Sequence, residues 1–226
     1  MTEPKVLVVG AGGVLGGALC TEFRAAGYRV LGLRRHASES EAGADVVPCD
    51  LSNPPATWRV IDGLVRQHGH FDVAICNAAH LDIAPFMELA LEHFDSAWRA
   101  CVGTAFACAR ALLPSMRGRG KGALIMSGAT ASLRGSARFS AFASAKFALR
   151  GLAQSLAREF QSEGVHVAHV VIDGVLRGSA SEARFAKAAH ACLEPREVAR
   201  AYRQLAEQDA NAWTHELDLR AQGEKF

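Results

Sequence analysis

Short apolar runs alternate along the chain with longer segments in which apolar residues recur at helical spacing. The runs are rich in β-branched residues and too short for helices, so we predict seven strands, over residues 5–9, 28–33, 45–49, 71–76, 123–126, 165–172 and 216–219. The segments between them predict helices, as where Val60, Ile61, Leu64 and Val65 share one face. The predicted helices cover residues 18–26, 57–68, 91–116, 139–163 and 195–208.

This alternation predicts an α/β fold with a doubly wound, mostly parallel sheet and helices on both faces. The connections between strands are long enough for parallel crossovers. No repeat, low-complexity segment or linker interrupts the pattern, so we predict a single domain over residues 1–226. The Ala-rich segment 177–194 is the predicted mobile substrate loop.

Composition narrows the class of protein. Of the 226 residues, 50% are hydrophobic and 21% are charged, which is typical of a globular domain and excludes disorder as the main state. The net charge of +2 argues against nucleic-acid or membrane partners. No apolar run is long enough to span a membrane, and no signal peptide is visible, so we expect a cytoplasmic protein. The six cysteines have no zinc-site spacing, and we expect no metal.

A glycine-rich segment follows the first predicted strand and precedes the first predicted helix. It fits GxxGxxG, and also GxGxxG with the last glycine one residue late. Glycines allow the backbone to approach a phosphate closely, and a helix N-terminus offers free N–H groups to it. We therefore predict that this loop binds a dinucleotide, through Gly10, Gly12, Gly13, Val14, Leu15 and Gly16.

The residues after the second strand bear on the choice of nucleotide. NAD sites usually carry an acidic residue there, but this chain has Arg34 and Arg35. Two guanidinium groups favour a 2′-phosphate, so NADP(H) is predicted over NAD(H); the alternative is a solvated basic turn. Further predicted contacts follow the third and fourth strands, at Asp50, Leu51, Asn77, Ala78 and Ala79.

Taken together, these motifs resemble the short-chain dehydrogenase/reductase family over nearly the whole chain. The resemblance rests on the glycine loop, Asp50-Leu51, and the segments 76–79, 141–149 and 165–172. It implies a Rossmann-type seven-stranded sheet that binds NAD(P). It also implies a homodimer or homotetramer whose interface is formed by the two long helices.

The family's catalytic residues are a Tyr-x-x-x-Lys pair, a Ser thirteen residues before the Tyr, and an Asn on the preceding helix. Lys146 matches the Lys, but the other three positions align with Phe142, Ala129 and Cys101. A phenyl ring has no proton to give, and a methyl group donates no hydrogen bond. The sequence thus favours cofactor binding, with Lys146 on the ribose, more strongly than carbonyl reduction.

Other side chains are candidates to replace the missing groups. The hydroxyls of Ser127, Thr130 and Ser132 flank Ala129, and His80, next to Asp82, is a candidate acid. Each of these also has a plain structural reading in a strand end or a solvated loop. Cys101 has no neighbour in sequence that would activate it as a nucleophile. Two residues concern ligands rather than catalysis: Arg134 is a candidate partner for an anionic substrate, and Asp173 lies near the nicotinamide end or caps a turn.

Three functions remain open at this point. The first is an NADP(H)-dependent oxidoreductase that acts on a small carbonyl or alcohol with an atypical active site. The second is a catalytically inactive nucleotide-binding protein or partner subunit, and the third is a lyase or isomerase on the same fold. The substrate is not identified by the sequence.

Overall fold

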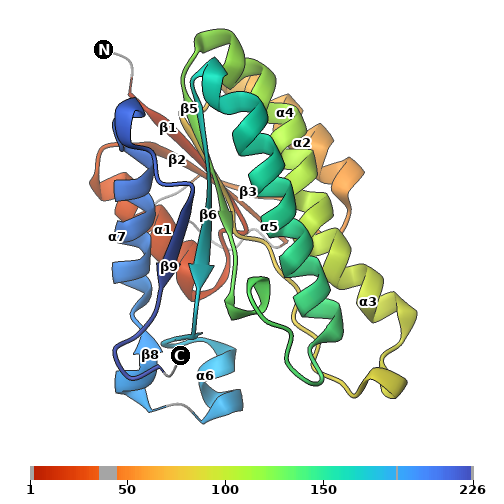
Figure 1. Cartoon of the computed structure of the whole chain (residues 1–226). Coiled ribbons are helices and arrows are strands. Elements are labelled where there is room, and N and C mark those ends of the chain that lie inside the picture. Colours follow the sequence, from red (N-terminus) through yellow and green to blue (C-terminus); the bar gives the residue numbers. More distant parts are fainter. Residues whose placement is uncertain (1–2, 36–44, 187, 225–226) are drawn as a thin grey trace.

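Seven parallel strands form the central sheet of the computed structural model, which describes residues 3–35, 45–186 and 188–224. Their order is β3-β2-β1-β4-β5-β6-β9 (Figure 1). Their bounds are β1 Lys5–Val9, β2 Arg29–Arg34, β3 Asp45–Pro48, β4 Val73–Cys76, β5 Gly122–Ser127, β6 Val165–Ile172 and β9 Glu216–Leu219. The predicted fold is confirmed, and each predicted strand corresponds to one of these seven.

Helices cover both faces of the sheet (Figure 1). The helices α1 (Gly13–Ala25) and α7 (Pro195–Ala206) pack on one face. The other face carries α2 (Pro54–His68), α4 (Thr104–Arg119) and α5 (Ser140–Phe160). Successive side chains of a strand point to opposite faces, so β1 contributes to both halves of the core, with Val6 and Val8 on the α1 side and Leu7 and Val9 on the α4 side.

The predicted helix over residues 91–116 is interrupted, which corrects that prediction. It consists of α3 (Leu91–Trp98), one turn of π-helix (Arg99–Gly103) and α4, which continues to Arg119. At the π-turn the chain packs tightly against α2, because a Cβ on Gly103 would lie 2.6 Å from the Cγ of Pro54. A π-turn arises where tertiary packing inserts one residue into a helix, and hydrophobic periodicity does not reveal it.

Two predicted helices begin earlier than expected. The helix α1 includes the last glycines of the loop, and α2 begins at Pro54, whose missing N–H costs nothing in a first turn. The side chain of Asn53 caps α2 by accepting a hydrogen bond of 3.1 Å from the N–H of Ala56.

The segment 177–194 contains short elements. The strands β7 (Val175–Leu176) and β8 (Cys192–Leu193) pair in parallel, with α6 (Ala180–Phe185) between them. Residue 187 lies outside the described residues, and the mobility of this segment stays a prediction. Short 3-10 turns lie at Phe86–Glu88, Thr130–Ser132, Gln161–Glu163, Ala189–Ala191 and Ala210–Ala212.

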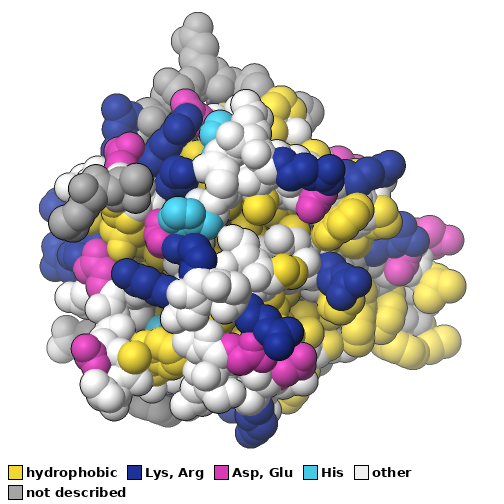
Figure 2. Space-filling model, turned by 90° about the horizontal axis from the view of Figure 1, so that it is seen from above, with side chains coloured by type: hydrophobic (Ala, Val, Ile, Leu, Met, Phe, Trp, Pro, Cys, Tyr) yellow, Lys and Arg dark blue, Asp and Glu magenta, His cyan; other side chains and the backbone are white. Residues whose placement is uncertain are grey.

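The surface carries charges of both signs in close alternation, as Figure 2 shows for the face at the amino ends of the strands. None of the described helices is both long and apolar enough to cross a bilayer. Within the same described residues, no three His, Cys, Asp or Glu side chains come together as metal ligands.

Candidate functional site

The strand order reverses at β1, with β2 and β3 on one side and β4, β5, β6 and β9 on the other. In doubly wound sheets, ligands bind at such a switch point, beyond the carboxyl ends of the strands. A cavity of about 470 Å³ lies there and is lined by residues that follow β1, β2, β3 and β4. The described lining includes Gly10, Gly12, Gly13, Arg34, Arg35, Asp50, Leu51, Asn77, Ala78, Ala79 and His80. The structure thus gathers most of the predicted cofactor residues around one cavity.

The glycine loop needs its glycines for packing as well as for a ligand. Gly10 has φ of +96°, and a Cβ there would lie 2.7 Å from the backbone nitrogen of Ala78. The side chain of Asn77 donates a hydrogen bond of 3.0 Å to the carbonyl of Gly10 and so fixes the loop against the end of β4. In contrast, a Cβ on Gly13 would meet nothing within 4 Å, so the loop leaves open space where α1 begins. Open space at a helix N-terminus suits a phosphate.

Three predicted residues of this loop do not line the cavity. Leu15 is buried among apolar side chains between the sheet, α1 and α7. Gly16 is enclosed by the loop itself, because a Cβ would lie 2.4 Å from the carbonyl carbon of Ala11. Val14 faces Gly178, where a Cβ would approach its Cγ1 to 3.4 Å.

The carboxyl end of β2 makes one part of the same cavity basic. Arg34 closes β2 and Arg35 follows it as an exposed side chain. Asp50 contributes a carboxylate whose Oδ1 accepts bonds of 3.0 and 2.7 Å from the N–H and hydroxyl of Ser52. These hydrogen bonds lower the pKa of Asp50. The cavity is therefore lined both by an open helix N-terminus and by two arginine residues.

A second cavity, of about 300 Å³, adjoins the segment that follows β4. Phe142 and Ala129 both line it, so the structure places these two predicted positions on one pocket. The remaining lining is mostly apolar and aromatic, with a few polar residues. It comprises Leu81, Thr130, Ala131, Arg134, Ser136, Phe139, Ile172, Gly174, Val175, Ser181, Phe185 and Glu224.

Lys146 stands behind the wall of this pocket. Its ammonium donates a hydrogen bond of 2.7 Å to the carbonyl of Ser127 and lies 5.6 Å from the ring centroid of Phe142. The residue is only 2% exposed, and this burial lowers the pKa of Lys146, while the thiol of Cys101 acts to raise it. Cys101 is itself buried in the π-turn. The pocket thus has a cation close by but a phenyl ring in front of it.

The candidate substitute donors are already engaged or lie elsewhere. The hydroxyl of Ser127 is buried and accepts a hydrogen bond of 2.8 Å from Tyr202. Thr130 lines the pocket, but its hydroxyl donates to the Oδ1 of Asp173 at 2.7 Å. His80 lines the nucleotide cavity instead and pairs with Asp82 at 2.8 Å. Of the three, only Thr130 lines the pocket beside Phe142, and its proton is given to Asp173.

The carboxylate of Asp173 connects three segments of the chain. The side chain is 3% exposed and binds Thr130 through Oδ1 and the guanidinium of Arg220 through Oδ2 at 2.8 Å. It thereby ties the end of β6 to the turn at Thr130 and to the chain after β9. Ser132, the remaining hydroxyl of that turn, accepts a hydrogen bond of 3.1 Å from the N–H of Ala129.

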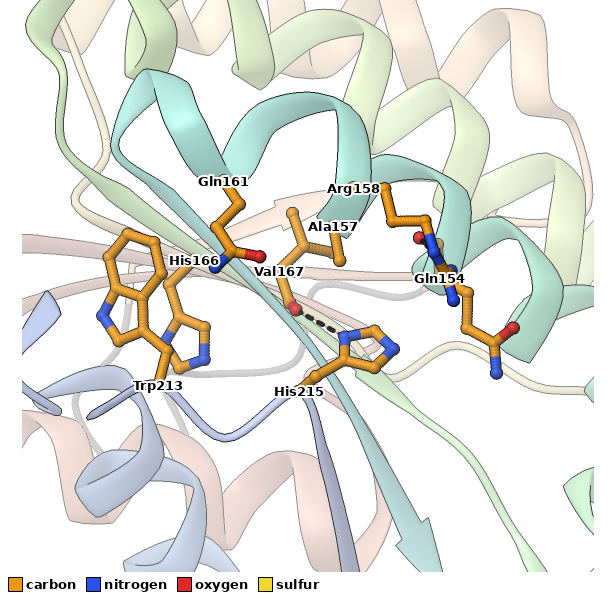
Figure 3. Close-up of a pocket in the computed structure, with 8 residues that line it drawn as sticks. All are labelled: Gln154, Ala157, Arg158, Gln161, His166, Val167, Trp213 and His215. Carbon is orange, nitrogen blue, oxygen red and sulfur yellow. Dashed lines mark hydrogen bonds between the residues drawn. The ribbon is translucent and has the colours of Figure 1, made fainter. Parts of the chain in front are cut away.

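Sequence reasoning missed two features. One is Tyr202 of α7, whose contact with Ser127 joins residues 75 positions apart. The other is a cavity of about 230 Å³ at the amino end of β6, where the rings of His166 and Trp213 stack with centroids 5.0 Å apart (Figure 3). There His215 donates through Nδ1 to the carbonyl of Val167 at 3.1 Å. Neither feature has a spacing or motif that would mark it in the sequence.

Comparisons with known proteins agree with this architecture. A family model described as short chain dehydrogenase matches residues 4–189. Among curated proteins, an uncharacterized oxidoreductase of Schizosaccharomyces pombe is 29% identical over 185 residues, which is 80% of this chain and 70% of that protein. The D-threitol dehydrogenase of Mycolicibacterium smegmatis is 26% identical over 171 residues, which is 71% of this chain and 66% of that protein.

Solved structures show the same fold over almost the whole chain. A short-chain dehydrogenase from Rhodopseudomonas palustris aligns with a TM-score of 0.82 and 32% identity, covering 97% of this chain and 99% of that chain. A metagenomic short-chain oxidoreductase in complex with NADP has a TM-score of 0.82 and 24% identity, and covers 98% of both chains.

Proposed function

Because this chain belongs to the short-chain dehydrogenase family, we propose that it binds NADP(H) and acts as an oxidoreductase on a small carbonyl or alcohol with an atypical active site. The observation that carries the choice of nucleotide is the basic end of the cavity at the switch point. Arg34 and Arg35 line it where an NAD site usually has a carboxylate. A 2′-phosphate there would neutralise two guanidinium groups.

The residues present fit such a nucleotide. The open face of the loop at Gly13 would receive the phosphates, and Asp50 and Leu51 would border the adenine. When bound, the nicotinamide donates or accepts the hydride. Lys146 would turn its ammonium from the carbonyl of Ser127 toward the ribose hydroxyls, which would recover part of the hydration that burial removes. Phe142 and Ala129 would shape the pocket wall without moving a proton.

The test is a calorimetric titration of the purified protein with NADPH and NADH. We expect NADPH to bind at least tenfold more tightly. The variant Arg35→Ala should lose about tenfold or more of its NADPH affinity, since it removes a charge-assisted hydrogen bond, and should keep its NADH affinity. Arg66→Ala, at an exposed position in the last turn of α2, is the matched control. Equal affinities for the two nucleotides would contradict the proposed preference.

One observation favours a second candidate, a nucleotide-binding protein without redox activity. The hydroxyl of Thr130 donates its proton to Asp173, and the hydroxyl of Ser127 is buried against Tyr202 and does not line the pocket. Two family catalytic positions, Phe142 and Ala129, cannot donate a proton. NADPH binding without any consumption across ketones, imines and enones would support this candidate over the oxidoreductase. Product formation without NADPH consumption would instead indicate a lyase or isomerase.

A further inference from the structure

The pocket beside Phe142 has an aromatic interior and one cation whose hydrogen-bond donors are unused. Phe139 and Phe185 stack with ring centroids 6.3 Å apart, and Phe142 forms a further part of the wall. Arg134 lines the same pocket with half of its side chain exposed. Its guanidinium makes no hydrogen bond within the described part of the chain. An aromatic slot with a free guanidinium offers both apolar contact and a planar fork of donors.

The carboxylate nearest to Arg134, that of Asp173, accepts no hydrogen bond from its guanidinium. Asp173 accepts from Thr130 at 2.7 Å and pairs with Arg220 at 2.8 Å, so both of its oxygens are occupied. The closest nitrogen of Arg134 stays 3.9 Å from it, beyond hydrogen-bond distance. Asp173 therefore attracts Arg134 by charge alone and leaves its donors available.

Two other charged side chains lie at or near the pocket. Glu224 also lines the pocket and places a negative charge there. Lys146 lies behind Phe142 and adds a second positive charge to the surroundings. The guanidinium of Arg134 has no acceptor within hydrogen-bond distance in the described part of the chain, so its donors remain open to an anion.

We propose that this pocket takes a small aromatic or branched aliphatic carboxylate, with its apolar body among the phenylalanine rings and its carboxylate on Arg134. This inference rests on the proposed function in so far as the ligand is the substrate of the same site. Arg134 is then a specificity-determining residue: it selects the acid over the neutral amide of the same shape. A bidentate pair between a guanidinium and a carboxylate is the interaction that makes this selection.

Phenylacetate and phenylacetamide are probes that differ only in this charge. Calorimetry is performed on the protein with and without saturating NADP⁺. We expect phenylacetate to bind with a dissociation constant of about 1 mM or tighter, and phenylacetamide at least about tenfold more weakly. Arg134→Gln should remove that preference and leave phenylacetamide binding unchanged, whereas Phe185→Ala should weaken both probes alike.

Arg66→Gln, outside the pocket in the last turn of α2, serves as the control and should behave as the wild type. The proposal is overturned if the two probes bind equally, if neither binds, or if Arg134→Gln keeps the preference for the acid. NADP⁺ titrations of the same samples report on the proposed function separately. Loss of nucleotide binding with an intact acid preference would refute that function and not this inference.

Discussion

The side chain at position 142 decides whether the pocket has a proton to give. The ring of Phe142 lines the pocket, and the ammonium of Lys146 lies 5.6 Å from its centroid. A phenol hydroxyl on this ring would stand near a buried cation, which stabilises the phenolate and lowers the pKa of a tyrosine. Ala129 faces the same pocket and offers only a methyl group. A phenyl ring and a methyl group thus give this part of the pocket an apolar wall without a proton donor.

The double variant Phe142→Tyr with Ala129→Ser should restore carbonyl reduction. A positioned acid contributes about 10²- to 10⁴-fold, so we expect a gain of that order in NADPH oxidation with phenylpyruvate as the ketone. Phe142→Leu, which adds no hydroxyl, should show no gain. A wild-type rate equal to that of the double variant would mean that the pocket already has a proton donor, and would contradict the assignment of these two positions.

At the scale of elements, the carboxylate of Glu216 connects two strands and one helix at the edge of the sheet. Glu216 of β9 receives two hydrogen bonds of 2.7 Å from Arg150 of α5 and one of 3.0 Å from the Nδ1 of His169 of β6. His169 is fully buried, and this burial lowers its pKa to about 4, against the opposing effect of Glu216. The folded protein therefore holds His169 neutral.

This burial makes stability depend on pH. Below its ordinary pKa of 6.5, His169 takes up a proton in the unfolded chain but not in the folded one, until the pH reaches about 4. Stability should thus fall by about 2 kcal/mol between pH 7 and 4.5. Burial also lowers the pKa of His166, which adds to the fall in the same direction.

Urea unfolding at several pH values measures this effect. The substitution His169→Gln should flatten the dependence of the free energy of unfolding on pH between pH 6.5 and 4.5, because the amide of glutamine does not titrate. The substitution His93→Gln, at an exposed position, should leave this dependence unchanged. Below that window the titration of Glu216, whose pKa Arg150 lowers, takes over. An unchanged slope in His169→Gln would show that this histidine is not the group responsible.

At the scale of the whole molecule, the fold can be predicted from patterns in the sequence. The strands are apolar runs, and the glycine loop stands between the first strand and the first helix, so the sheet and the nucleotide cavity are predictable. The pocket is less predictable, because Phe185 belongs to α6, whereas Arg134 and Phe139 lie in the loop before α5. The contact of Tyr202 with Ser127 and the π-turn at Cys101 depend on tertiary packing alone. Periodicity describes one element at a time and carries no information on such contacts.

The molecule also exposes apolar side chains that a monomer would not need to expose. Phe106 of α4 is 59% exposed and Phe147 of α5 is 44% exposed. Hydrophobic side chains also gather on the side of the molecule that carries α3, α4 and α5 (Figures 1 and 2). Contiguous exposed apolar surface marks an interaction site. We therefore expect self-association through α4 and α5.

Light scattering coupled to size-exclusion chromatography measures the assembly. The wild type should elute as a dimer or tetramer, and Phe106→Glu with Phe147→Glu should shift it toward the 24.0 kDa monomer, because burying two carboxylates in an apolar interface is costly. Trp58→Glu, which changes a 40% exposed aromatic side chain on α2, is the matched control and should leave the assembly unchanged. Near-UV circular dichroism of the double variant would separate dissociation from unfolding. A wild type that stays monomeric up to high concentration would show that these two phenylalanines serve another contact.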